Sequence, residues 1–231
     1  MLKMLDEILL SDNVVEKFYQ AYADNDFHCW LNSFLPEAED CSNTQQDNPW
    51  HLYDCLKHIL YSVEEINKQT KGKSESLRRL LAYVMFLHDL GKPQCKIRRF
   101  SNVYGREVDS FFNHNVASTE IAKRALPFLN FSEIEGKKML LLVYEHDIFM
   151  SISLTNDGNP YHQVLSKALL QEKVKMLQEG MGMEKESMQD GIELMQCLFM
   201  IARADNLAQN PELTGESLKK IDGIESVFNQ I

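Results

Sequence analysis

The chain has 231 residues, of which 44% are hydrophobic and 25% are charged, and this composition predicts one compact folded unit with a sizeable core. Its formal net charge of −10 disfavours a general nucleic-acid coat and an anionic membrane surface, because the long-range field repels polyanions. The five cysteines are scattered and show no C-x-x-C spacing, which favours a reducing compartment over a disulfide framework.

The first residues, MLKMLDEILL, carry acids within a helical pattern and do not resemble a signal peptide. No apolar run in the sequence is long enough to cross a bilayer. We therefore expect a cytoplasmic protein that has no membrane partner.

The N-terminal part, residues 1–47, is expected to be a helical extension and loop packed on the main domain. Apolar spacings near three and four predict one or two short helices over residues 1–22, with a break at 11–13. Residues 25–48 are mostly polar and predict a surface excursion with a single helical turn.

Strongly apolar segments follow. We expect one helix over residues 50–68, and a central buried helix, LRRLLAYVMFLHDL, that ends at Gly91 in a left-handed cap. Residues 92–113 predict a loop or short ribbon. Helices are then expected over 114–129, 132–148, 160–180 and 188–209, and the C-terminal tail, 212–231, is expected to be helical. The fold class is all-α, with a ribbon-like insert.

Ionisable residues stand where two apolar helices should be buried. His88 and Asp89 end the segment VMFLHDLG, and Asp205 follows LFMIARAD. A buried carboxylate costs several kcal/mol unless it is paired or bound to a cation. Imidazole nitrogen and carboxylate oxygen both suit a divalent metal, although the pair alone would equally suit an exposed helix end.

Three further histidines lie at the edges or ends of apolar helices, namely His58, His114 and His146. Each alone has a plain structural explanation, such as a boundary residue or a cation favoured by a helix C-terminus. The order H, HD, H, H, D along the chain is more specific than any one of them. His51 lies seven residues before His58 on the same helix face and is the alternative first ligand.

The segments HLYDCLKHILYSVE, LLAYVMFLHDLGKP, FFNHNVASTEIAKRAL, LLLVYEHD and LFMIARADNLAQNP together resemble the HD-domain superfamily over residues 48–211. In detail they are similar to the HD domain attached to bacterial CCA-adding tRNA nucleotidyltransferases, here without the nucleotidyltransferase head. The resemblance implies a helical bundle. It also implies two divalent ions, of iron, manganese, nickel, cobalt, zinc or magnesium.

In that resemblance, His58, His88, Asp89 and Asp205 hold the first metal, Asp89 bridges to a second, and His114 and His146 complete the second site. The family's H-[TS]-[LIV] pattern falls on His58, with Ile59 in place of the hydroxyl residue, which leaves His51 to face the substrate. Two such cations would give a hydroxide at neutral pH that attacks phosphorus. The implied activity is hydrolysis of a phosphomonoester or phosphodiester of a nucleotide or short oligonucleotide.

Cations near the motif are candidates for substrate binding. Lys92 follows the HDLG string and is expected to act on the phosphate as a catalytic residue, although a solvated surface lysine is the plain alternative. Arg98 and Arg99 belong to a basic cluster with interleaved aromatics, and Arg203 and Asn206 flank Asp205.

The rival hypothesis keeps the fold but makes the chain a non-catalytic module. It would sense a nucleotide or bind RNA or a protein partner, and its metal would be structural. The sequence leaves the substrate, the metal and any homo-oligomer open.

Overall fold

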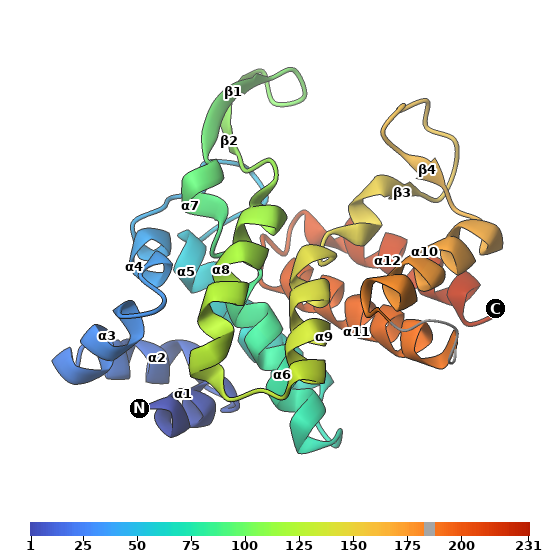
Figure 1. The fold of residues 1–231 in the computed structure, drawn as a ribbon. Helices are drawn as coiled ribbons and strands as arrows, with labels where there is room; N and C mark the ends of the chain where they lie inside the picture. Colours follow the sequence, from blue (N-terminus) through green and yellow to red (C-terminus); the bar gives the residue numbers. More distant parts are fainter. Residues whose placement is uncertain (183–187) are drawn as a thin grey trace.

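The structure, a computed structural model, describes residues 1–182 and 188–231. It is an all-α fold, as the sequence predicted, and the strands of the described residues form two small two-stranded sheets. Figure 1 shows the helices gathered into one body, from which two strand-bearing segments project on the same side. The candidate site lies at that end of the bundle.

Four short helices form the N-terminal part: α1 (Leu2–Leu9), α2 (Val14–Tyr22), α3 (Asn25–Asn32) and α4 (Glu37–Ser42). The break between α1 and α2 falls where the sequence predicted it. The expectation of a surface excursion over residues 25–48 was wrong, because much of this segment forms α3 and α4. Asp24 caps α3 by accepting hydrogen bonds from the backbone N–H groups of Asp26 and Phe27. Phe27, Leu31 and several following apolar side chains are then fully buried.

The two central helices are α5 (Cys55–Gln69) and α6 (Glu75–Leu87). Helix α5 begins later than the sequence predicted, because the Asp54 carboxylate accepts from the backbone N–H of Lys57 and caps the helix there. Helix α6 is buried on all sides from Leu80 to its end, as its composition predicted. It carries His88 and Asp89 into the interior.

Gly91 does not close α6 as a left-handed cap, and that prediction was wrong: its φ angle is −78°. Glycine is needed there because helix α8 (His114–Leu129) passes so close that a Cβ atom would lie 2.5 Å from the backbone nitrogen of Ser118. The short helix α7 (Lys92–Cys95) follows, and then strands β1 (Ile97–Ser101) and β2 (Arg106–Ser110). They form the expected ribbon, an antiparallel hairpin with Ile97 opposite Ser110.

The rest of the chain packs against these helices. It comprises α8 (His114–Leu129), α9 (Glu133–Tyr144), a 3-10 helix (Ile148–Ser151), β3 (Ile152–Ser153), β4 (Gln163–Val164), α10 (Lys167–Gly180), α11 (Met188–Leu207) and α12 (Thr214–Phe228). Helix α9 ends earlier than expected, and α10 begins later, at the Ser166 cap. The parallel pair β3–β4 was not predicted.

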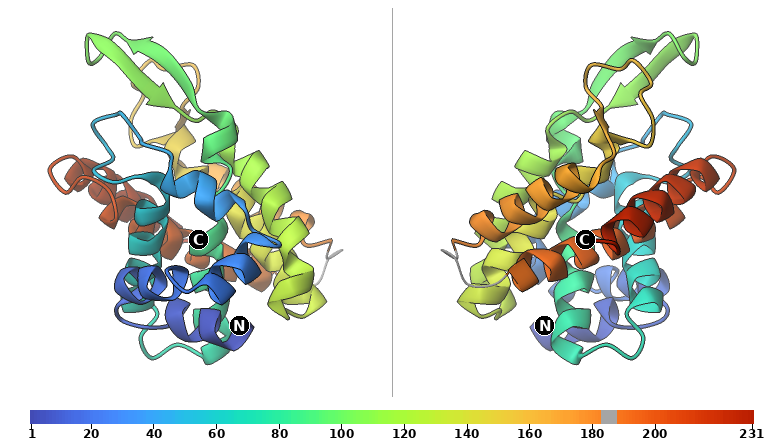
Figure 2. Two further views of the ribbon diagram at one scale, coloured as in Figure 1. Left: turned by 90° about the vertical axis from the view of Figure 1, so that its left-hand side faces the viewer. Right: turned by 90° about the vertical axis from the view of Figure 1, so that its right-hand side faces the viewer.

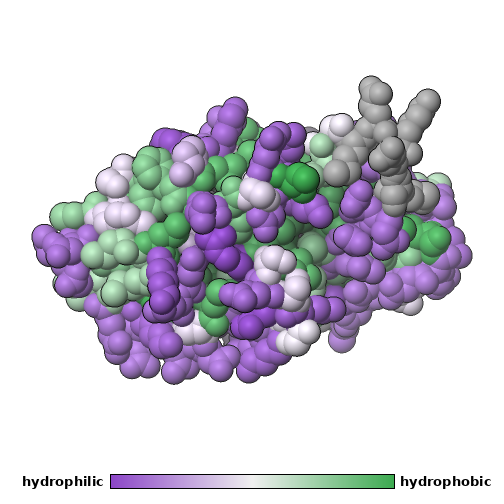
Figure 3. All heavy atoms as spheres, turned by 60° about the horizontal axis from the view of Figure 1, so that its bottom comes forward, coloured by the Kyte–Doolittle hydropathy of each residue, from purple (hydrophilic) through white to green (hydrophobic). Residues whose placement is uncertain are grey.

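One hydrophobic cluster contains residues from the N-terminal helices, the central helices, α11 and α12, for example Leu5, Phe18, Phe86, Phe199 and Phe228. Figure 2 shows the N-terminal helices lying against the central ones, while the C-terminal helix α12 packs on α11 and α10. The face turned away from the hairpin is mainly hydrophilic, with scattered apolar groups (Figure 3). Within the described part of the chain, no helix combines the length and apolar character needed to cross a membrane.

Candidate functional site

Helix ends bring together all six residues that the sequence singled out as ligands. His58 lies on α5, and His88 and Asp89 follow α6 directly. The others come from three further helices: His114 begins α8, His146 follows α9, and Asp205 lies near the end of α11. Five helices therefore converge on one buried point below the hairpin.

A first group surrounds one oxygen of Asp89. The Nε2 atom of His58 lies 3.2 Å from Asp89 Oδ2 and 2.9 Å from Asp205 Oδ1. The Nε2 atom of His88 lies 3.2 Å and 3.4 Å from the same two oxygens. These four side chains each offer a ligand atom within 4.8 Å of the others, which is close enough to share one ion.

A second group surrounds the other oxygen of Asp89. His114 Nε2 lies 3.1 Å from Asp89 Oδ1, and His146 Nε2 lies 3.9 Å from it. The two imidazole Nε2 atoms are 3.0 Å apart. Asp89 thus presents one carboxylate oxygen to each group, and this is the arrangement of a bridging carboxylate.

Backbone carbonyls fix the tautomer of all four histidines. A carbonyl oxygen only accepts, so each Nδ1 carries the hydrogen, and in the neutral ring Nε2 presents a lone pair to the interior. The Nδ1 atoms of His58, His88, His114 and His146 lie 3.3, 2.6, 2.8 and 2.7 Å from the carbonyl oxygens of Ala208, Met85, Phe111 and Val143, respectively.

The inward-facing atoms lack hydrogen-bond partners. Of the described side chains, His58 Nε2, His88 Nε2 and Asp89 Oδ1 are buried and make no hydrogen bond of normal geometry. Neutral His114 and His146 point lone pairs at one another across 3.0 Å. Buried polar groups are costly without partners, and a divalent cation at each group would satisfy these atoms together. The donors present therefore suit a divalent metal ion.

The electrostatics of the site also demand positive charge. Burial opposes the charged form of His88, but Asp89 and Asp205 outweigh it and raise the pKa of His88 to about 10. Burial likewise opposes ionisation of Asp89, yet the surrounding cations hold its pKa well below the usual value. Protons on the imidazoles balance the carboxylates, so a metal ion at this site would compete with protons.

Lys92 reaches into the same site and is almost fully buried. Its Nζ atom lies 2.6 Å from Asp89 Oδ2, donates to Gln46 Oε1 at 3.0 Å, and lies 3.3 Å from His51 Nε2. Burial and the Lys92 charge hold the pKa of His51 well below its ordinary value. His51 is therefore neutral and stands beside Lys92, whereas His58 is the histidine of this helix region that contacts the carboxylates.

A pocket of about 650 Å³ opens over these groups. Asp89, His114, His146 and Asp205 contribute to its lining. Aromatic side chains from the segment before α5 and from the hairpin region form a large part of its wall, among them Trp50, Tyr104, Phe111 and Phe112. Trp50 Nε1 donates to the Tyr104 hydroxyl at 3.0 Å and ties the hairpin to the body.

The predicted substrate-binding residues divide into two sets. His51, Lys92, Arg99 and Asn206 line the pocket.

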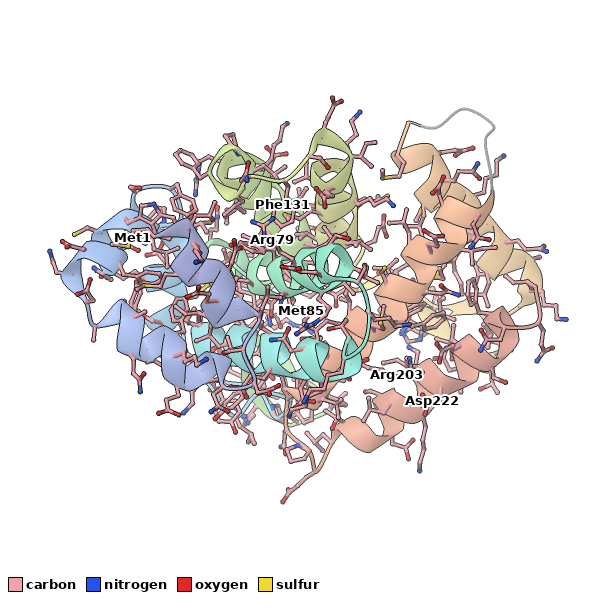
Figure 4. The ribbon with its side chains drawn as sticks, turned by 90° about the horizontal axis from the view of Figure 1, so that it is seen from below. Met1, Arg79, Met85, Phe131, Arg203 and Asp222 are labelled. Carbon is pink, nitrogen blue, oxygen red and sulfur yellow. The ribbon has the colours of Figure 1, made fainter. Side chains whose placement is uncertain are left out.

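Arg98 and Arg203, which were expected to bind the substrate, do not line it. Arg98 is held by Asp47 at 2.7 Å and by Asp109 at 3.2 Å. Arg203 points from α11 towards α12, where it pairs with Asp222 at 2.8 Å (Figure 4). Both guanidinium groups are occupied by carboxylates.

Sequence reasoning missed Asp147. Its Oδ2 atom lies 3.4 Å from His114 Nε2 and 3.6 Å from His146 Nε2, and its side chain is one-third exposed to the pocket. The signal was present, because His146 and Asp147 repeat the His-Asp pair of residues 88–89. Trp50, Gln46 and Lys220 were also missed, since nothing in the local sequence marks them.

Comparison with known proteins gives a weak relationship. No family model matches the chain. A bifunctional uridylyltransferase/uridylyl-removing enzyme of Ruegeria pomeroyi is 25% identical over 140 residues, which are 55% of this chain. The matched part is only 14% of that enzyme's length. The chain is thus similar to a small portion of a much longer protein.

Proposed function

We propose that this protein is an HD-domain phosphohydrolase with two divalent cations, and that residues 48–211 form the HD domain. It would hydrolyse a phosphomonoester or phosphodiester of a nucleotide or short oligonucleotide. One observation carries the proposal: Asp89 divides its two oxygens between two groups of inward-facing imidazoles at a pocket. A relative named for uridylyl removal supports the same class of reaction.

The residues of the chain have separate tasks in this reaction. His58, His88, Asp89 and Asp205 would hold one cation, and Asp89, His114 and His146 would hold the other. When bound, the cations supply Lewis acidity towards the phosphate and a deprotonated water at neutral pH. The carbonyl bonds at each Nδ1 keep the four rings oriented, so little reorganisation accompanies binding or reaction.

Lys92 supplies a fixed positive charge to the phosphate. Gln46 and His51 hold its ammonium group at the edge of the ligand cluster, where the pocket begins. There it neutralises charge that develops on a phosphate oxygen. The aromatic wall limits access of bulk water and offers faces on which a base can stack.

The proposal is tested by a screen of generic phosphate monoesters and diesters with added manganese, nickel or magnesium. We expect turnover of at least one ester that depends on the added cation and is stopped by a chelator. Saturable nucleotide or RNA binding, with one tightly held ion and no turnover of any ester, would instead support the non-catalytic module.

Replacement of Lys92 by alanine is expected to lower turnover by about ten- to a hundredfold, because one preorganised charge on the phosphate is lost. The metal content should stay unchanged, since the ligand groups are intact. Both quantities are compared with the wild type and with Lys71→Ala, which removes an exposed lysine far from the pocket. A fall in metal content would show that Lys92 supports the ligand cluster rather than the phosphate.

A further inference from the structure

The pocket contains positive charge that the proposed reaction does not use. Three described lysine or arginine side chains line it, namely Lys92, Arg99 and Lys220. Lys92 is paired with Asp89. Arg99 is engaged on the hairpin, where its Nε atom donates to Ser110 Oγ at 2.6 Å and its guanidinium group lies over the Phe112 ring. Lys220 differs from both.

Lys220 comes from α12, on another side of the pocket from the hairpin (Figure 1). Its Nζ atom donates to the backbone carbonyl of Met150 at 3.3 Å, and it forms no ion pair with a carboxylate of the described residues. The chain has 34 acidic and 24 basic residues, so carboxylates are plentiful. An ammonium group has three donors, and one carbonyl leaves the others free.

The environment of Lys220 disfavours a cation that has no anionic partner. The side chain is partly buried, and this burial lowers the pKa of the ammonium group despite the charge of Asp157. Ser217 lies one turn earlier on the same helix face and also lines the pocket. An anion at this point would restore the lost solvation and accept hydrogen bonds from both side chains.

Lys220 lines the same pocket as the second ligand group. The carbonyl that it contacts belongs to the 3-10 helix directly after Asp147, and the Met150 N–H donates to the Asp147 carbonyl at 2.8 Å. Because Lys220 and the ligand cluster line one pocket, a chain of linked phosphates is the kind of ligand that would contact both.

We propose that Lys220 and Ser217 form a second anion subsite, and that the substrate carries a second phosphate beyond the one that is hydrolysed. This inference rests on the proposed function, because it assigns the first phosphate to the metal groups. Nucleotides with a diphosphate or longer phosphate chain belong to the substrate class. Nucleoside monophosphates leave the second subsite empty.

The test compares two non-hydrolysable probes, methylenediphosphonate and methylphosphonate, by calorimetry on the full chain supplied with manganese. Lys220→Gln removes the charge but keeps a donor for the Met150 carbonyl. Lys219→Gln is the matched control, since Lys219 is the exposed neighbour on the same helix. We expect Lys220→Gln to weaken methylenediphosphonate binding about tenfold, as loss of one charge-assisted contact predicts, and to leave methylphosphonate binding unchanged.

Unchanged methylenediphosphonate affinity in Lys220→Gln would overturn the inference, as would an equal loss for both probes or the same loss in Lys219→Gln. Binding of these probes needs no turnover, so the experiment distinguishes failure of the second anion subsite from failure of the proposed hydrolase activity. Absence of ester hydrolysis in the wild type counts against the proposed function. A missing difference between the probes in a protein that hydrolyses esters counts against the second subsite alone.

Discussion

Asp89→Asn is expected to remove both cations and to lower turnover by about a thousandfold or more. The amide keeps the size of the side chain but loses the charge and one acceptor oxygen. Because each oxygen of Asp89 faces a separate histidine group, a single substitution damages both groups. Metal analysis and ester hydrolysis are measured on the same purified sample.

Asp12→Asn is the control for this variant, because Asp12 is an exposed carboxylate that pairs with Lys71 at the surface. It should retain the metal content and the activity of the wild type. Full activity of Asp89→Asn would contradict a catalytic role for the ligand cluster. Retained metal with lost activity would show that Asp89 acts on the substrate and does not bridge two ions.

Gly91→Ala is expected to reduce the free energy of unfolding by about 2–3 kcal/mol, as overpacking in a tight interior does. A Cβ atom there would lie 2.5 Å from Ser118 N, 2.6 Å from His114 O and 2.7 Å from Ala117 Cβ. Two of these are backbone atoms that cannot rotate away, so helix α8 must shift. That shift would carry His114 away from Asp89 and weaken the second ligand group.

Gly215→Ala is the matched control, because its added Cβ would meet no atom within 4 Å beyond the adjoining backbone of its own helix, and the residue is in the first turn of α12. Alanine favours the helix, so stability should stay the same or rise by up to about 1 kcal/mol. Chemical denaturation of both variants gives the comparison. Equal stabilities of Gly91→Ala and the wild type would mean that α7 and α8 can separate without cost.

The clustering of the candidate ligand residues was predictable from sequence because ionisable residues interrupt apolar helices. Such residues are rare in a core unless they have partners, so His88, Asp89 and Asp205 stood out as residues that needed them. The order of the histidines along the chain supplied the rest. Residues of the pocket wall do not stand out from their sequence surroundings in this way, because an aromatic residue or a lysine in a polar segment is ordinary.

Long-range ion pairs explain why Arg98 and Arg203 do not line the pocket. Arg98 is neutralised by Asp47, which lies 51 residues earlier in the chain, and Arg203 by Asp222, which lies 19 residues later. A local sequence window shows only the cation and not its partner. The prediction of a left-handed cap at Gly91 was wrong for a similar reason. Glycine is needed there because helix α8 passes close by, and not because of the turn that Gly91 itself forms.

The helices were predictable where they are long and their apolar pattern is strong. Helices α3 and α4 are short, and polar residues surround their few buried side chains, so tertiary packing rather than periodicity decides them. The starts of α5 and α10 depend on which polar residue caps the helix. Asp54 and Ser166 act as caps through hydrogen bonds that the sequence alone does not single out.

The metal content of the purified wild type and of His114→Ala tests the two-ion site most directly, with His28→Ala as a histidine control on α3, outside the ligand cluster. We predict about two divalent ions per chain in the wild type and in His28→Ala. In His114→Ala we predict one, because the group around His58 and His88 stays complete. Two ions retained in His114→Ala, or a single ion in the wild type, would contradict the bridging role of Asp89.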